Sequence, residues 1–147
     1  MTTLANRLLQ HEGLRLQAYD DANGKTIGPG SHVVGNPTIG IGTLIGPGGG
    51  ITEDEARVLA ENRISKARQA ARGLNSGLAE TDPRFDVLVE MAFQLGAAGL
   101  AKFTNTLQAV REKRWNDAAD GMLASLWAKQ TPARSKELAE VMRTGRA

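Results

Sequence analysis

The chain has 147 residues, of which 41% are hydrophobic, and its formal net charge is +2. This length is typical of one globular domain, and the hydrophobic content excludes a disordered chain. The lack of cysteine excludes disulfides and cysteine metal sites, and the two histidines, His11 and His32, are too few and too far apart to predict a histidine metal site.

Neither charge nor hydropathy points to nucleic acid or to a membrane. Nucleic-acid-binding chains usually carry dense Lys and Arg stripes with interleaved aromatic residues, whereas aromatic residues make up 4% of this chain. No apolar run reaches the ~20 residues that a membrane span requires. The opening stretch, MTTLANRLLQHEG, has no basic segment followed by a long apolar core, so we expect no signal peptide and no stable membrane insertion.

The first elements are predicted to be a short helix and a strand. Apolar residues at helical spacing over residues 1–12 predict a helix that places Glu12 near its carboxyl end, where Gly13 stops it. The next residues alternate between apolar and polar, which predicts a strand with one buried face formed by Leu14, Leu16 and Ala18.

The segment from Gly24 to Gly42 follows a turn at residues 20–24 and is rich in glycine and poor in helix-forming residues. Asn23-Gly24 is typical of a hairpin turn, and we expect small twisted antiparallel strands with a loop near residues 28–36. Within residues 38–42, isoleucine alternates with glycine, which predicts a strand with one apolar face and one bare backbone face that a ligand can approach.

The remainder of the chain shows helical patterns. Thr52 and Glu55 form a capping box at the start of a helix of about 20 residues, which would be roughly 30 Å long and able to link two lobes. Further helices are expected to begin at Pro83, near Thr104, near Trp115 and after the Thr131-Pro132 cap; Gly96 and Gly99 are expected to bracket a connection.

These patterns predict an α+β architecture. Residues 13–51 would form a small antiparallel-sheet lobe, residues 52–73 a connecting helix, and residues 74–147 together with 1–12 a larger helical lobe. A ligand would bind in the cleft between the two lobes.

Two carboxylates near the strand at 14–20 suit glycoside hydrolysis. That reaction needs one carboxylic acid to protonate the leaving oxygen and a second carboxylate to act from the other face. Glu12 and Asp21 lie on opposite sides of the strand, so a bend could direct both into one cleft. Spacing alone leaves open that they are ordinary surface acids, that Thr38 is a packing residue, and that Phe93 belongs to the core.

A family resemblance favours the catalytic interpretation. The motifs run in order through nearly the whole chain, and together they resemble the phage-type lysozymes, the T-even phage endolysin-like glycoside hydrolase family. They are His11-Glu12-Gly13-Leu14-Arg15-Leu16, Tyr19, Asp21, Gly24, Thr38-Ile39-Gly40-Ile41-Gly42, Ile51-Thr52, Asp54-Glu55-Ala56, Met91, Phe93-Gln94, Gly96, Gly99, Phe103-Thr104-Asn105, Arg114-Trp115, Trp127, Gln130-Thr131-Pro132, Arg134 and Arg143-Thr144-Gly145.

The resemblance implies a muramidase that cuts the β-1,4 bond between N-acetylmuramic acid and N-acetylglucosamine in bacterial peptidoglycan, with inversion. Glu12 matches the general acid, Asp21 the second carboxylate and Thr38 the residue that holds the attacking water. In an inverting enzyme the two carboxyl groups should lie ~6.5–9.5 Å apart. Positions that line the saccharide groove match Leu44, Phe93 and Thr106, and Arg134 matches an arginine that pairs with the acid.

The chain also departs from the family pattern. A glycine-rich insert between Asp21 and Thr38 creates a rival motif at Thr26, although the match at Thr38 is longer. Thr43 replaces a frequent histidine and Gly121 a saccharide-contacting asparagine, and the tail after Gly145 is shorter.

The resemblance further implies an endolysin made in the host cytoplasm that acts on the wall after release and causes lysis. We expect a monomer with no cofactor and no metal. Two alternatives stay open: a peptidoglycan-binding module with impaired catalysis, and a lytic transglycosylase, which needs no second carboxylate and leaves anhydro-sugar ends.

Overall fold

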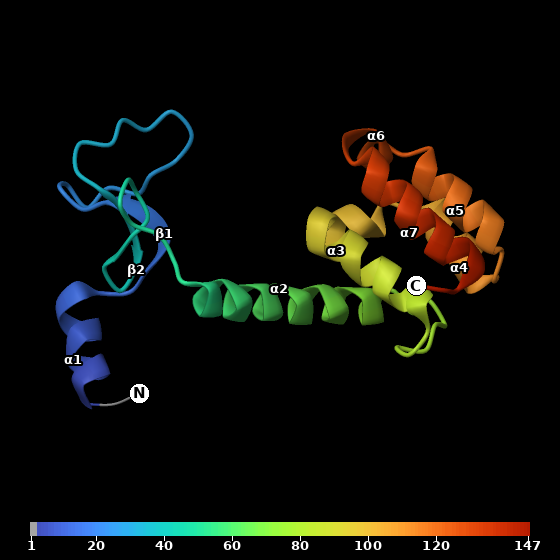
Figure 1. Ribbon diagram of the computed structural model, residues 1–147, viewed down its shortest axis with the longest axis horizontal. Coiled ribbons are helices and arrows are strands. Elements are labelled where there is room, and N and C mark those ends of the chain that lie inside the picture. The colour runs from blue at the N-terminus through green and yellow to red at the C-terminus, as the bar shows by residue number, and fades with distance from the viewer. Residues whose placement is uncertain (1–2) are drawn as a thin grey trace. The chain divides into compact units, whose positions relative to one another are not determined.

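A computed structural model describes residues 3–147, apart from the side chains of Thr3 and Glu12. Contacts within it divide the chain into two compact units: unit 1 ends at Ala56 and unit 2 runs from Arg57 to Ala147. An antiparallel sheet lies in unit 1 and most helices lie in unit 2, so the predicted α+β class is confirmed (Figure 1).

Helix α1 (Thr3–Glu12) ends where the sequence predicted. Gly13 adopts φ +72°, which is accessible to glycine at little cost, and its N–H donates to the Leu9 carbonyl at 3.0 Å. This turn leads directly into the sheet.

The sheet has the order β1-β2-β3, with β1 (Arg15–Asp20), β2 (Pro37–Gly40) and β3 (Thr43–Leu44) in antiparallel pairs. In the register of β1 and β2, Tyr19 lies opposite Thr38 and Asp20 opposite Pro37. In that of β2 and β3, Thr38 lies opposite Leu44. The pairing therefore brings the residues after β1 next to the residues before β2, across 16 intervening positions.

Two details of the predicted sheet were wrong. The strand expected over 38–42 ends at Gly40, because Gly40 and Gly42 take φ +70° and +74° and turn the chain into β3. The buried face expected on β1 is also not formed, since Leu16 is 80% exposed and Leu14 is 56% exposed. Hydrogen bonds, more than apolar burial, hold this part of unit 1.

Asp20 anchors the insert to the end of β1. Asp20 is 2% exposed, and its carboxylate accepts hydrogen bonds from the N–H groups of Val34 (2.7 Å), Gly35 (2.9 Å) and Ala22 (3.0 Å), and from the Asn23 amide (2.9 Å).

The Val34 N–H contributes most to lowering the pKa of Asp20 below its ordinary value of 3.8, because it stabilises the charged form; burial acts in the opposite direction. A carboxyl group with a lowered pKa in the folded state stabilises that state above pH 3.8. This stabilisation is lost as the pH falls through the lower, folded-state value.

Helix α2 (Glu53–Gly73) begins with the predicted capping box. The Thr52 N–H donates to the Glu55 carboxylate at 2.7 Å, and the Glu55 N–H donates to the Thr52 hydroxyl at 3.3 Å. These reciprocal bonds satisfy donors that the first helical turn leaves unpaired.

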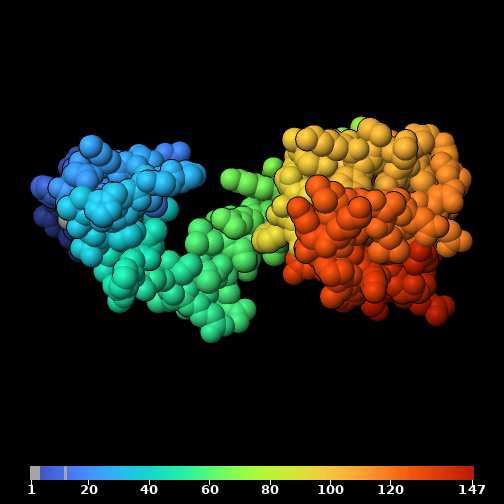
Figure 2. Space-filling model, turned by 90° about the horizontal axis from the view of Figure 1, so that it is seen from above, coloured from blue at the N-terminus to red at the C-terminus, as the bar shows by residue number. Residues whose placement is uncertain are grey.

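Unit 2 packs its helices around one apolar core. After α2 come α3 (Pro83–Ala101), α4 (Thr104–Arg111), α5 (Trp115–Leu123), α6 (Leu126–Gln130) and α7 (Pro132–Thr144). Leu88, Met91, Met122 and Met142 are fully buried between them. The space-filling view shows these helices as one continuous body (Figure 2).

Among the described helices, none is by itself long and apolar enough to cross a membrane; only α3 and α4 taken together, bent by 103°, reach that length and composition.

Three local features of unit 2 differ from the prediction. Gly96 does break α3, with φ +71°, but the helix resumes and Gly99 lies inside it. Helix α6 was not predicted, because its five residues are too short to show a period. Thr131 occupies the N-cap position and Pro132 opens α7 as predicted, but the Thr131 hydroxyl donates to the Trp127 carbonyl at 2.9 Å and makes no capping bond to the helix.

The expected division into residues 13–51, 52–73 and 74–147 with 1–12 stays a prediction, because it concerns how these parts pack together. The same is true of the cleft expected between the lobes.

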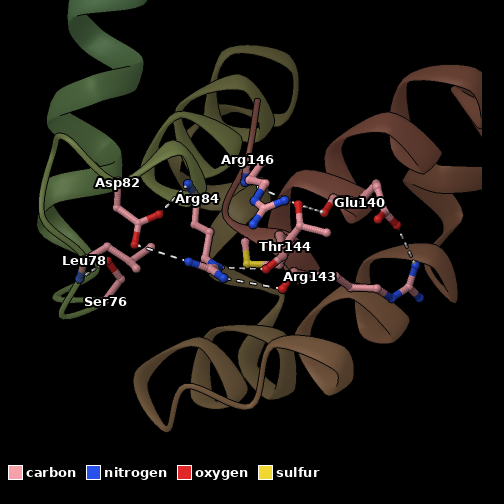
Figure 3. Close-up of polar contacts among 9 residues, drawn as sticks. Ser76, Leu78, Asp82, Arg84, Glu140, Arg143, Thr144 and Arg146 are labelled. Atoms are coloured by element: carbon pink, nitrogen blue, oxygen red, sulfur yellow. Dashed lines mark hydrogen bonds and ion pairs between the residues drawn. The ribbon is translucent and has the colours of Figure 1, made fainter.

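Arg84 ties the start of α3 to the end of α7 (Figure 3). Its Nε donates to the Met142 carbonyl at 2.8 Å and an Nη donates to the Arg143 carbonyl at 3.4 Å. The guanidinium group also stacks 4.2 Å from the centre of the Trp115 ring. The Arg84 side chain is 14% exposed. Its hydrogen bonds satisfy carbonyls at the end of α7 that have no partner inside the helix.

Replacing this arginine should destabilise unit 2. We expect Arg84→Ala to lower the free energy of unfolding by about 2–3 kcal/mol, since charge-assisted hydrogen bonds and a cation–π contact are lost. Arg84→Lys should lower the free energy of unfolding by less, because lysine keeps the positive charge although it lacks the planar guanidinium group. Urea denaturation measures both. Arg114→Ala, which removes exposed ion pairs with Glu112 and Asp117, is the control and should change little; equal effects of Arg84→Ala and Arg114→Ala would contradict this role.

Candidate functional site

Unit 1 brings Asp21 and Thr38 together. Asp21 lies in the exposed turn after β1, and Thr38 lies on β2 with 5% of its surface exposed. Among the described residues, no hydrogen bond joins these two side chains directly; each is hydrogen-bonded to Asn36.

Asn36 contacts Asp21 through its backbone and its side chain, and Thr38 through its backbone. Its N–H donates to Asp21 Oδ1 at 2.6 Å, and its Nδ2 donates to Asp21 Oδ2 at 3.1 Å. Its carbonyl oxygen accepts from the Asp21 N–H at 3.1 Å and from the Thr38 hydroxyl at 3.2 Å. The carboxylate and the hydroxyl are thus held by a single residue between them.

The local sequence explains this geometry. Pro37 opens β2, and proline drives the residue before it towards extended backbone, which suits Asn36 at the entry of a strand. A side chain at Gly35 would overlap with Asp21 Oδ1 and lie 2.6 Å from the Ala22 Cβ. Glycine at this position therefore lets the insert approach the Asp21 turn closely.

Glu12 is the last residue of α1, and β1 begins three residues later. The fold therefore places its backbone at the entrance of the sheet. Its side chain is not among those that the structure describes, so its separation from Asp21 and its pairing with Arg134 stay predictions. Arg134 itself lies exposed in the first turns of α7.

The two candidate threonines flank the same tyrosine. Thr38 pairs with Tyr19 on one edge of β1, and Thr26 forms an isolated bridge with Tyr19 on the other edge. Thr26 is exposed. In the described part of the chain, the Thr38 hydroxyl shares the Asn36 carbonyl with Asp21 and the Thr26 hydroxyl has no such link. This favours Thr38 as the partner of Asp21.

Leu44 lies beside Thr38 because the two residues are opposite each other in β2 and β3. It is half-buried, and its carbonyl accepts from the Gly50 N–H at 2.9 Å. Thr43, which replaces the frequent histidine, pairs with Ile39 in the same ladder.

Unit 2 carries the other two expected groove residues. Phe93 on α3 is 45% exposed, so the alternative that it belongs to the core was wrong. Thr106 on α4 is 5% exposed and lies against Gly121, where an added Cβ would be 2.5 Å from the Thr106 hydroxyl. The threonine side chain therefore occupies space that a larger residue at 121 would need.

A groove of about 600 Å³ lies next to Thr106 and Gly121. Trp127, which is 4% exposed, forms part of its wall, and the indole N–H of Trp127 donates to Gln94 Oε1 at 2.6 Å. The Phe103 ring packs edge-on against the Trp127 ring, with 6.4 Å between the two ring centres. The groove thus has a rigid aromatic wall and a hydroxyl at its edge.

Sequence reasoning missed Asn36. The signal was present, because an Asn-Pro pair directly precedes the Thr38 motif, but it became meaningful only once pairing of β1 with β2 placed it beside Asp21. Among the described residues, no three carboxylate or imidazole groups come together to hold a metal ion.

Comparison with known proteins gives several relatives, including the following three. The chain is 32% identical to peptidoglycan hydrolase gp36 of Pseudomonas phage phiKMV, over 88% of this chain and 14% of that protein. It is 29% identical to pre-baseplate central spike protein Gp5 of Enterobacteria phage T4, over 97% of this chain and 28% of that protein. It is 31% identical to probable T4-type lysozyme 2 of Dictyostelium discoideum, over 99% of this chain and 96% of that protein.

The chain therefore spans a small part of the two phage relatives and nearly all of the Dictyostelium one. The phage lysozyme family model matches residues 9–143. Because this match covers most of the chain and includes Glu12, Asp21 and Thr38, the chain belongs to the phage lysozyme family, a family of glycoside hydrolases.

Proposed function

We propose that the chain is a muramidase that hydrolyses the β-1,4 bond between N-acetylmuramic acid and N-acetylglucosamine in peptidoglycan, with inversion at the anomeric carbon. The observation that carries this proposal is the Asp21–Asn36–Thr38 network, in a chain of the lysozyme family that places Glu12 at the end of α1. The name of the phiKMV relative supports peptidoglycan as the substrate.

The reaction needs a proton donor and a water. Glu12 donates its proton to the leaving glycosidic oxygen as the bond from that oxygen to the anomeric carbon breaks. A water attacks the anomeric carbon from the opposite face and forms the new carbon–oxygen bond, and Asp21 takes the proton that this water releases. Proton exchange with solvent then returns Glu12 to the acid and Asp21 to the carboxylate.

Thr38 suits the task of holding that water. Its hydroxyl proton points to the Asn36 carbonyl, which leaves oxygen lone pairs to accept a hydrogen bond from water. Asp21 is exposed and can accept the second water proton. A water bound to both groups would have its oxygen lone pair free for the attack.

The sugar chain would contact Leu44 beside Thr38, and Phe93 and Thr106 in unit 2. An exposed aromatic ring and a groove with a hydroxyl at its edge are features that saccharides bind. The resemblance pairs Arg134 with Glu12. In such a pair the arginine charge would favour the ionised carboxyl group, so apolar surroundings would have to oppose it for Glu12 to donate a proton.

We further propose that the protein acts as an endolysin. It would be made in the host cytoplasm as a monomer that needs no cofactor, would reach the wall after release, and would cause lysis of the host.

Removal of the acid should abolish hydrolysis. We expect Glu12→Gln to lower the release of reducing ends from purified peptidoglycan by about 100-fold or more, because general acid catalysis is lost, while the melting temperature stays nearly the same. Pelleting with peptidoglycan should persist. A Glu12→Gln variant with most of its activity would refute the role of Glu12, and a wild-type chain that pellets with peptidoglycan without cutting it would indicate a binding module.

The two threonines can be separated by matched variants. We expect Thr38→Ala to lower the rate about 10-fold, since one hydrogen bond to the attacking water is lost. Thr26→Ala, on the other edge of β1, should stay within about twofold of wild type, as for most exposed substitutions. Initial rates of reducing-end release measure both. The reverse order of effects would show that Thr26 holds the water.

A further inference from the structure

We propose that Asn36 is a positioning residue for Asp21, and that the glycine-rich insert exists in this chain to deliver it. This inference rests on the proposed function, because it assigns the role of Asn36 through the carboxylate that activates water. It concerns residues 34–36, the end of the insert that precedes β2.

Three successive backbone N–H groups of the insert donate to two successive carboxylates. Val34 and Gly35 donate to the two oxygens of Asp20, and Asn36 donates to Oδ1 of Asp21. The Asp21 N–H returns a bond to the Asn36 carbonyl. Hydrogen bonds therefore run in both directions between the end of the insert and the Asp20-Asp21 turn.

The two carboxylates in this arrangement serve different purposes. Asp20 is 2% exposed and every one of its partners belongs to the turn or the insert, so it is structural. Asp21 is exposed and is held by one residue. The buried carboxylate fixes the insert, and the fixed insert orients the exposed carboxylate.

Asn36 controls the orientation of Asp21 because it contacts both oxygens. A single donor would allow the carboxylate to rotate about its terminal bond, which has a broad torsional preference. Donors on Oδ1 and Oδ2 fix that rotation. Each carboxylate oxygen has two acceptor sites, so one site on each oxygen stays available for water.

Other charged side chains on neighbouring segments are engaged elsewhere or lie on the exposed insert. Arg15 donates to the Gly24 carbonyl at 2.7 Å and stacks on Tyr19, with 4.6 Å from its guanidinium carbon to the ring centre. Lys25 and His32 are exposed. Among the described hydrogen bonds, those to the Asp21 carboxylate come from Asn36.

A pair of asparagine variants tests the proposal. Asn36→Ala removes the Nδ2 donor to Asp21 and keeps the backbone donor. We expect kcat on soluble glycan strands to fall about fivefold with an unchanged KM, the effect of about one hydrogen bond. Asn23→Ala removes a similar amide donor from the same turn, but one that serves Asp20; its kcat should stay within about twofold of wild type.

A double-mutant cycle separates positioning from a structural effect. In an Asp21→Ala background, Asn36→Ala should cause no further loss of kcat, because the group through which it acts is gone. An additional fivefold loss in that background, or a rise in KM in place of a fall in kcat, would overturn the proposal.

An NMR measurement tests the contact without relying on activity. The Asn36 backbone amide proton, in a 2.6 Å bond to a carboxylate, should resonate downfield and move upfield in Asp21→Ala, whereas the Asn23 side-chain amide should not. An Asn36 signal that does not respond overturns the contact. If the signal responds but the wild-type chain cuts no glycan, the proposed function fails while the contact stands.

Discussion

The candidate site depends on the pairing of β1 with β2. Placing Asp20 opposite Pro37 brings the turn after one strand against the segment before the other, and every contact of Asp21 and Thr38 with Asn36 follows from that register. A shift by one residue would move each side chain to the opposite face of the sheet. The buried Asp20 carboxylate opposes such a shift, because the N–H groups of Val34 and Gly35 would lose their partner.

The two units are stabilised in different ways. Unit 2 has an apolar core with fully buried leucine and methionine side chains, and Arg84 links two of its helix ends. Unit 1 leaves Leu14 and Leu16 exposed and relies on turns, strand ladders and carboxylate–amide bonds. A short sheet held by directional bonds fixes side-chain positions closely, which suits groups that must align a water with a reacting carbon. The proposed chemistry accordingly resides in unit 1.

Much of this structure could be predicted from periodicity and from turn and cap residues. The capping box at Thr52, the stop at Gly13 and the helix start at Pro83 are local, and all three are confirmed. The end of β2 at Gly40 was not predictable from alternation, because glycine is compatible with both a strand and a left-handed turn. Asn36 escaped prediction for another reason: its partner is 15 residues away, and only strand pairing reveals the contact.

The match to the phage lysozyme family covers Glu12, Asp21 and Thr38, and the contacts of Asn36 hold Asp21 and Thr38 in one arrangement. In the proposed reaction, a water held at Asp21 and Thr38 attacks the anomeric carbon directly. Early-time NMR of the reducing ends released from purified peptidoglycan tests it best. Direct attack on a β-linked sugar predicts that the α-anomer forms first, followed by mutarotation. Initial formation of the β-anomer, or of anhydro-sugar ends, would contradict direct attack by water.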